Sequence, residues 1–423
     1  MSYTHEYYWQ KLRDVGRRCQ RVIRDLRVVS LPPQGKPRGN VLLSYQLEPF
    51  TVDPQAVNKS HPVHWHSNNW ESRQIANTFL DRGYTVDAIA WMNRAFRPRK
   101  KYDVVIDIRY NLQKWAPELP PDCLKIFHAD SAHTLTRVAA ESRRLLDVLH
   151  RRGVPLQLRR FEDPNRGIES CDCSTVIGNE YTLETYRYAG KPLFQVPVSS
   201  MLSMPFTEDK DYDACRRTFV WLGSGGMVSK GLDLTLEAFA RMPDHQLIVC
   251  GAVNKEPDFE QAYYKELYQT PNIRTLGWTD VRSQAFAEVI RQSVGLIFPS
   301  CCEGQAGSVI NCMSGGLIPI VSYESGVDVD DFGMILHESS IEEIRGAITQ
   351  ISSLPIEDLR AMSHGAWTRA VTRHSREAWR THYRNLISNI LELHHRGELA
   401  AQPSMEPVIS GLGFNTELQK GCL

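Results

Sequence analysis

The sequence predicts an α/β protein of two domains, each built on a parallel sheet that helices cover. Its 423 residues amount to about twice the length of an ordinary domain. Short apolar segments typical of strands alternate with amphipathic segments typical of helices, and this order favours parallel pairing. The polar stretch 207–217 interrupts the alternation, so we expect one domain at 40–206 and another at 207–375.

Residues 1–39 are expected to form a basic amphipathic helix and a linker. Arginine and lysine side chains fill one helical face, and the linker LPPQGKPRG is rich in helix breakers. The segment 8–28 can lie on an anionic membrane surface, or it can pack against its own domain with the arginines in water. The other face is apolar, at Tyr8, Leu12, Val15, Cys19, Val22 and Leu26.

The first domain repeats a strand and helix pattern. The segment 71–82 predicts a helix that ends at Gly83, with Ile75, Phe79 and Leu80 facing inward. We expect strands at 41–45, 85–90, 104–108, 124–128 and 175–177.

The second domain shows the same alternation more clearly. A long apolar-periodic helix, 376–396, is expected to leave this domain and pack on the first, and an irregular tail follows at 397–423. Strands are expected at 219–222, 247–250, 273–276, 296–298 and 318–321, and helices at 232–242, 263–268, 283–291 and 309–314.

Composition argues against nucleic-acid-binding, membrane-spanning and secreted classes of protein. Lys plus Arg and Asp plus Glu both total 49, and this neutral balance argues against binding nucleic acid through bulk charge. No apolar run is long enough to span a membrane, and the first residues lack the layout of a secretory signal. Ten cysteines without CxxC spacing indicate free thiols. We therefore expect a cytoplasmic protein, with a peripheral location on the inner face of the membrane left open.

Two glycine-containing turns follow predicted strands and can approach a ligand closely. In the first, Gly223-Ser224-Gly225-Gly226 leads to Lys230 at the start of a helix, where free amides can hold an anion. The pattern is neither a Walker motif nor GxGxxG, and a tight turn with an exposed lysine is the alternative. The second turn, Glu303 to Ser308, places a carboxylate beside another helix start; Glu303 can hold sugar hydroxyls or simply cap the helix.

These segments resemble a known family. VWLGSGGMVSKGLDLTLEAF, IRTLGWTD and IFPSCCEGQAGSVINCMSGGLIPIVS are similar to the C-terminal domain of retaining GT-B glycosyltransferases, above all family 4, the glycosyl transferases group 1. NNWESRQIANTFLDRGYTVD and LKIFHADSAHT resemble the N-terminal domain of that family. The resemblance implies two Rossmann-like domains that face each other across a cleft, with the C-terminal helix crossing back to the first.

The resemblance also implies site residues. Lys230 would contact the donor diphosphate, Glu303 the transferred sugar, and His128 would lie near the reacting sugar as a second catalytic residue. Three departures from the family pattern stand out: Asn311 replaces a second glutamate, no arginine accompanies Lys230, and Asn68 and Asn69 replace a glycine pair. The other donor-binding residues implied are Gly225, Gly226, Gly304, Gln305, Ala306, Gly307, Ser308 and Asn311.

The implied reaction is transfer of a hexosyl group from a nucleotide-diphospho-sugar, in its UDP or GDP form, to a glycan, a lipid-linked acceptor or a precursor of a surface polysaccharide. The anomeric configuration would be retained without a metal ion or other cofactor. The three departures keep two alternatives open: a non-catalytic nucleotide-sugar-binding scaffold, and a GT-B-fold epimerase or phosphorylase.

No metal site is predicted. Asp328 and Asp330 form an Asp-x-Asp triplet, which 49 acidic residues produce by chance. His61, His64 and His66 lie in a short stretch that lacks further partners at metal-ligand spacing, so we expect a solvated loop.

Overall fold

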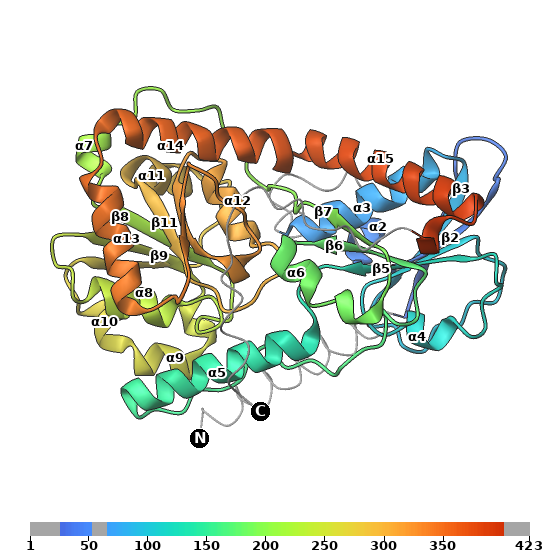
Figure 1. Cartoon of the computed structure of the whole chain (residues 1–423), viewed down its shortest axis with the longest axis horizontal. Coiled ribbons are helices and arrows are strands. Elements are labelled where there is room, and N and C mark those ends of the chain that lie inside the picture. The colour runs from blue at the N-terminus through green and yellow to red at the C-terminus, as the bar shows by residue number, and fades with distance from the viewer. Residues whose placement is uncertain (1–25, 53–65, 402–423) are drawn as a thin grey trace, which may run out of the picture.

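The computed structural model describes residues 26–52 and 66–401. Two sheets lie side by side along the longest axis of the molecule, and helices cover the faces of each (Figure 1). The first sheet uses strands between residues 28 and 196, and the second uses strands between residues 218 and 336.

Seven strands form the first sheet, in the order β1-β3-β2-β4-β5-β6-β7. All neighbours are parallel except β1 and β3. The edge strand β1 begins at Val28, so the helix expected over 8–28 is wrong for residues 26–28; the rest of that segment lies outside the described residues. The strands are β1 Val28–Leu31, β2 Gly39–Tyr45, β3 Tyr84–Ala90, β4 Val104–Asp107, β5 Leu124–Ala129, β6 Cys173–Ile177 and β7 Leu193–Val196.

Six parallel strands form the second sheet, in the order β10-β9-β8-β11-β12-β13. The central strands β11 and β12 are buried at every residue, as helices on both faces require. The strands are β8 Thr218–Gly223, β9 Gln246–Gly251, β10 Ile273–Gly277, β11 Gly295–Phe298, β12 Ile318–Ser322 and β13 Met334–Leu336.

The helices of the first half include α3, which begins four residues earlier than expected. His66 caps it, since its Nδ1 accepts a hydrogen bond from the Asn68 amide at 3.3 Å. The helices are α2 Glu48–Thr51, α3 Ser67–Leu80, α4 Leu112–Trp115, α5 Thr134–Arg152 and α6 Glu180–Glu184.

The second half has shorter helices around its sheet, and α8 and α12 both fall within a few residues of the predicted bounds. Strand β13 and helices α13 and α14 have no counterpart among the predicted elements. The helices are α7 Tyr212–Cys215, α8 Leu232–Phe239, α9 Pro257–Ala262, α10 Tyr264–Tyr268, α11 Gln284–Gln292, α12 Gly307–Met313, α13 Ile341–Ser353 and α14 Ile356–Arg369.

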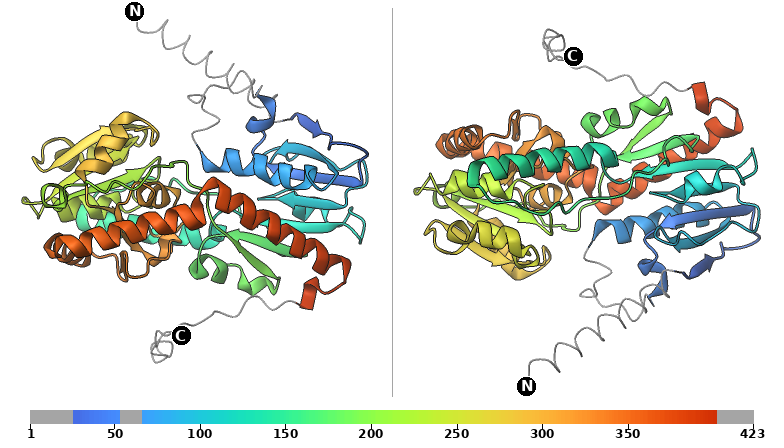
Figure 2. Two further views of the ribbon diagram at one scale, coloured as in Figure 1. Left: turned by 90° about the horizontal axis from the view of Figure 1, so that it is seen from above. Right: turned by 90° about the horizontal axis from the view of Figure 1, so that it is seen from below.

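Two helices cross between the halves. Helix α15, Arg376–His395, follows a π-helical turn at Ala370–His374 and runs along one side from the second half to the first, which confirms the predicted crossing (Figures 1 and 2). Helix α5 lies along the opposite side, beneath α9, and was not predicted (Figure 1).

One apolar core is continuous across both halves. It includes Val41 and Ile106 of the first sheet, Val309 of α12, and Tyr383 and Ile387 of α15. Burial of this apolar surface holds the two halves together and therefore fixes the space between them.

Candidate active site

A cleft of 270 Å³ opens between the two halves. The segments that line it follow the carboxyl ends of parallel strands, which is where open α/β sheets bind ligands. The first half contributes the start of α3, Asp130 after β5, Arg160 and Val198; the second half contributes Gly223, Ser224, Lys230, 278–282 and 303–308.

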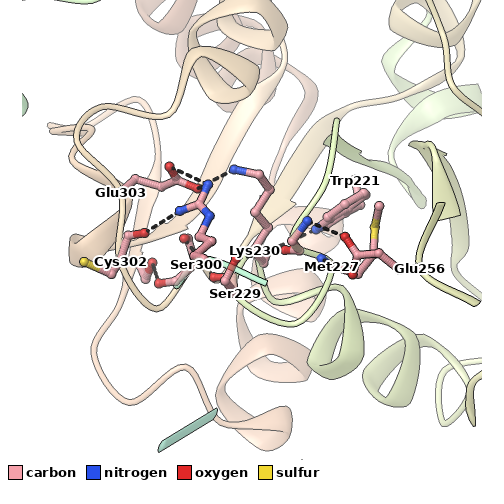
Figure 3. Close-up of polar contacts among 11 residues, drawn as sticks. Trp221, Met227, Ser229, Lys230, Glu256, Ser300, Cys302 and Glu303 are labelled. Carbon is pink, nitrogen blue, oxygen red and sulfur yellow. Dashed lines mark hydrogen bonds and ion pairs between the residues drawn. The ribbon is translucent and has the colours of Figure 1, made fainter. Parts of the chain in front are cut away.

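Glu303 is the centre of an ionic cluster in this cleft (Figure 3). Lys230 Nζ binds its Oε1, and Arg160 Nη2 lies 3.0 and 3.2 Å from its two oxygens. Burial by itself would raise the pKa of Glu303, but the charges of Arg160 and Lys230 outweigh it and lower the pKa to about 2. Glu303 is therefore ionised at neutral pH, ready to accept hydrogen bonds from hydroxyl groups.

Lys230 is held rigidly in the wall of the cleft. Its carbonyl accepts a hydrogen bond from Trp221 Nε1 at 3.1 Å. The preceding carbonyl, of Ser229, accepts from the Cys301 amide at 2.8 Å and from Ser300 Oγ at 3.0 Å, which ties the Lys230 segment to the Glu303 segment (Figure 3). Burial and the adjacent Arg160 charge lower the pKa of Lys230.

The glycine-rich turn presents its amides to a carboxylate of the protein itself. The amides of Gly226 and Met227 donate to Glu256 at 2.5 and 3.2 Å (Figure 3). Gly225 and Gly226 do not line the cleft, whereas Gly223 does. Gly226 has a φ of +71°, a conformation that favours glycine, so this turn is shaped for Glu256 rather than open to a ligand.

The segment 303–308 packs tightly against the first half. Gln305 Oε1 accepts from the Val198 amide at 2.8 Å, and the carbonyl of Gly304 accepts from Thr182 Oγ1 at 2.9 Å. A Cβ on Gly304 would stand 2.8 Å from the carbonyl oxygen of Asp130, so this close approach requires glycine. The remaining predicted residues Ala306, Gly307 and Ser308 line the cleft at the start of α12.

Asn311 lines the cleft but uses its side-chain oxygen to hold the segment that joins the two halves. Its Oδ1 accepts from the amides of Met201 at 2.8 Å and Leu202 at 3.3 Å, and from Ser200 Oγ at 3.2 Å. A carboxylate here would meet the same donors, so the neutral amide is compatible with a structural use of this position.

His128 lies behind the cleft, fully buried, and is not part of its lining. Its Nδ1 is 2.8 Å from Thr175 Oγ1, and burial lowers its pKa to about 4, so the ring is neutral. Asp130, two residues further along the chain, reaches the cleft and forms an ion pair with Arg109 at 2.5 Å. The first half therefore presents Asp130 to a ligand where the sequence favoured His128.

Comparison with known proteins agrees with this geometry. A family model described as glycosyl transferases group 1 matches residues 216–353. The chain carries a glycosyltransferase group 1 domain. The matched residues include Lys230 and Glu303, the ion pair in the wall of the cleft. A comparison with curated proteins finds no match.

Solved structures share this GT-B fold. Sucrose-phosphate synthase from Thermosynechococcus elongatus superposes with a TM-score of 0.58 at 14% identity, over 85% of this chain and all of that one. HepE from Anabaena, in complex with UDP and glucose, superposes with a TM-score of 0.50 at 11% identity, over 83% of this chain and 100% of that one. The GtfA/B complex superposes with a TM-score of 0.52 at 13% identity, over 70% of this chain and 58% of that one.

Three residues at or next to the cleft were not found from the sequence: Asp130, Arg160 and Glu256. Arg160 and Glu256 belong to segments with no motif of their own, whereas Asp130 lies within the quoted segment LKIFHADSAHT. The alternation of side chains along β5 offered a signal for Asp130, since His128 and Asp130 lie two residues apart at the end of a buried strand. Nothing in the local sequence indicates that Arg160 and Glu256 meet the glycine-rich turn.

Three of the residues considered for metal binding, Asp328, Asp330 and His66, make other contacts. Asp328 accepts a hydrogen bond from Asn179 at 3.0 Å, and Asp330 pairs with Arg369. Across 26–52 and 66–401 there is no group of three or more His, Cys, Asp or Glu side chains that could hold a metal ion. His66 caps α3, while His61 and His64 lie outside the described residues. Among the helices described, none is long and apolar enough to span a membrane.

Proposed function

We propose that this glycosyltransferase moves a hexosyl group from a UDP-sugar to a glycan or a lipid-linked acceptor, such as a precursor of a surface polysaccharide. The observation that carries the proposal is the pair formed by Lys230 and an ionised Glu303 in the wall of the cleft. A cation suits a diphosphate, and a fixed carboxylate suits sugar hydroxyls. UDP-glucose is the first donor to test, because the structure of HepE, similar in fold, contains UDP and glucose.

In this proposal Lys230 neutralises the charge that grows on the leaving diphosphate. Glu303 orients the sugar, with Gly304, Gln305 and Ala306 beside it. Asp130 faces the reacting sugar from the first half, and the neutral, buried His128 lies two residues earlier in the chain. Gly307 and Ser308 lie on the phosphate side and Asn311 on the ribose side, while Gly225 and Gly226 shape the turn behind them.

The proposed reaction replaces one bond at the anomeric carbon with another. The bond between the anomeric carbon and the phosphate oxygen breaks while the acceptor oxygen bonds to that carbon from the same face. The acceptor proton passes to the departing diphosphate oxygen. Attack on the side of the leaving group retains the anomeric configuration, and preorganised positive charge around the diphosphate lowers the barrier.

A transfer assay tests the proposal. We expect UDP-glucose and a mixture of glycan and polyprenyl-phosphate sugar acceptors to release UDP with wild-type protein. Lys230→Ala and Glu303→Gln should each lower the turnover about 10²–10³-fold, since each removes a charge at the reacting bond. Lys265→Ala, at an exposed lysine on α10, is the matched control and should leave the rate unchanged.

Other outcomes would identify the alternatives. Donor binding without UDP release in any acceptor mixture would indicate a scaffold. Consumption of inorganic phosphate would indicate a phosphorylase, and a changed sugar on an intact nucleotide would indicate an epimerase. If the acceptor is lipid-linked, the segment 8–28 should direct the protein to anionic liposomes, and its deletion should abolish flotation with them.

A further inference from the structure

Arg160 reaches the donor side of the cleft from the other half of the molecule. It belongs to the segment 153–166, which follows α5 and returns to the first sheet at β6. Two carboxylates fix this segment: the amides of Arg159 and Arg160 donate to Glu141 at 3.1 and 2.9 Å, and the amide of Gln157 donates to Asp258 at 2.9 Å. The guanidinium group is therefore held in place before any ligand arrives.

The guanidinium lies between Glu303 and the glycine-rich turn. Its Nη2 binds both oxygens of Glu303, and its Nη1 donates to the carbonyl of Cys302 at 3.1 Å. Its Nε faces Gly226, where a Cβ would stand 3.4 Å away, and makes no hydrogen bond within the described part of the chain. An arginine has five N–H groups, so Arg160 can stay on Glu303 and still donate to a further anion.

Lys230 and Arg160 converge on the same carboxylate from the two halves of the molecule. In the family that the sequence resembles, an arginine of the glycine-rich turn accompanies the lysine, but GSGGMVSK contains none. Within the cleft lining, Lys230 and Arg160 are the cations that bind Glu303, and both are at least three-quarters buried. The guanidinium charge suits phosphate oxygens, and with Nη2 on Glu303 the Nε–H remains to donate a charge-assisted hydrogen bond.

We propose that Arg160 is a donor-binding residue, which binds the diphosphate of the nucleotide-sugar together with Lys230 and replaces the arginine absent from the turn. This assignment rests on the proposed function. Because Lys230 and Arg160 belong to different halves, the diphosphate site is complete only when segment 153–166 is docked on the second half. The alternative is that Arg160 merely positions Glu303.

Calorimetric binding of nucleotides separates these two roles. UDP, GDP and ADP are titrated into the full-length protein, each with its nucleoside as a phosphate-free reference. We expect Arg160→Gln to weaken binding of the preferred diphosphate about 10- to 100-fold and to leave nucleoside affinity unchanged, because hydrogen bonds to charged groups are lost. Arg160→Lys keeps the charge and should recover part of the loss. Arg166→Gln, at an exposed arginine of the same segment, is the matched control.

Other binding results would overturn the assignment of Arg160 as a donor-binding residue. An unchanged diphosphate Kd in Arg160→Gln, with a lower kcat, would overturn the assignment and leave Arg160 as a positioning residue for Glu303. A wild-type protein that binds none of the three diphosphates would also overturn it. If wild type binds a diphosphate through Arg160 but transfers no sugar, the proposed function fails and the binding assignment stands. Should Arg160→Gln not fold, the comparison of Arg160→Lys with wild type decides.

Discussion

Helices α5 and α15 both join the two halves, but different forces hold them. The buried residues of α15 are Trp379, Tyr383, Ile387 and Ile390, all within the continuous apolar core. The buried residues of α5 are Thr134, Arg137, Glu141 and Val148, and only the last is apolar.

Helix α5 contacts the second half through charged side chains as well as through Val148, which is buried in the apolar core of that half with Leu145 packed against it. Arg151 binds the fully buried Asp233 at 2.7 Å, and Arg152 binds Glu266 at 2.8 Å. Arg144 donates to the carbonyl of Pro299 at 3.1 Å. Ion pairs that water partly reaches contribute less than buried apolar surface and respond to salt and pH. We infer that α15 fixes the two halves and that α5 adjusts their contact, including the position of Arg160.

The largest expected loss of stability comes from truncating a buried aromatic residue of α15. Trp379 is fully buried, stacks on Tyr383 at 4.9 Å and meets Trp70 edge-on at 5.4 Å. Trp379→Ala should lower the free energy of unfolding by about 3–5 kcal/mol, as for other large-to-small core changes. Urea unfolding measures it, with Leu146→Ala on the exposed face of α5 as the control. A loss below about 1 kcal/mol in the free energy of unfolding would show that the packing of α15 is not the main interaction between the two halves.

Helix α3, which packs against α15, contains a buried titratable group. Glu71 of α3 is fully buried and accepts from the Ser199 amide at 2.7 Å; burial raises its pKa to about 7. The raised pKa means that the folded protein loses stability as pH rises from about 4.5 to 7, by roughly 3 kcal/mol at most. Glu71→Gln should flatten this part of the stability profile, measured by urea unfolding between pH 5 and pH 8. Equal pH dependence in both proteins would contradict the assignment.

A smaller loss of stability, which grows as pH rises, is expected when an ion pair of α5 is broken. Burial raises the pKa of Asp233, while Arg144 and Arg151 counter it. Arg151→Gln removes one counter-charge, so the pKa of Asp233 should rise further and the deficit in stability should grow as pH increases. Because Arg151 is partly exposed, we expect a loss of about 1–2 kcal/mol at pH 8 and less at pH 5.

Thermal unfolding at the two pH values, with and without high salt, checks this prediction. Arg143→Gln, an exposed arginine on the same helix, should show no such dependence. If Arg151→Gln is equally destabilised at pH 5 and pH 8, then packing of the arginine stem rather than charge holds α5.

Periodic burial explains why one crossing was predicted and the other missed. In α15 the core side chains recur at helical spacing, and the helix spans Arg376–His395 as expected. In α5 the buried face mixes Arg137 and Glu141 with Val148, so charged residues interrupt the apolar stripe on the side that packs. The strands inside the two sheets were predictable because burial on both faces gives continuous apolar runs, whereas the edge strands β1, β7 and β13 were not predicted.

The sequence alone determined the two parallel sheets, the crossing of α15 and the segments that carry Lys230 and Glu303, because each depends on local periodicity or on glycine at the end of a strand. Only the tertiary structure decided that Glu256 occupies the glycine-rich turn, that Asp130 rather than His128 reaches the cleft, and that Arg160 meets Glu303. Arg160 and Glu303 are separated by 143 positions, and their contact depends on how α5 docks. Charged contacts of this kind leave no repeating pattern, since a single side chain at any spacing can make them.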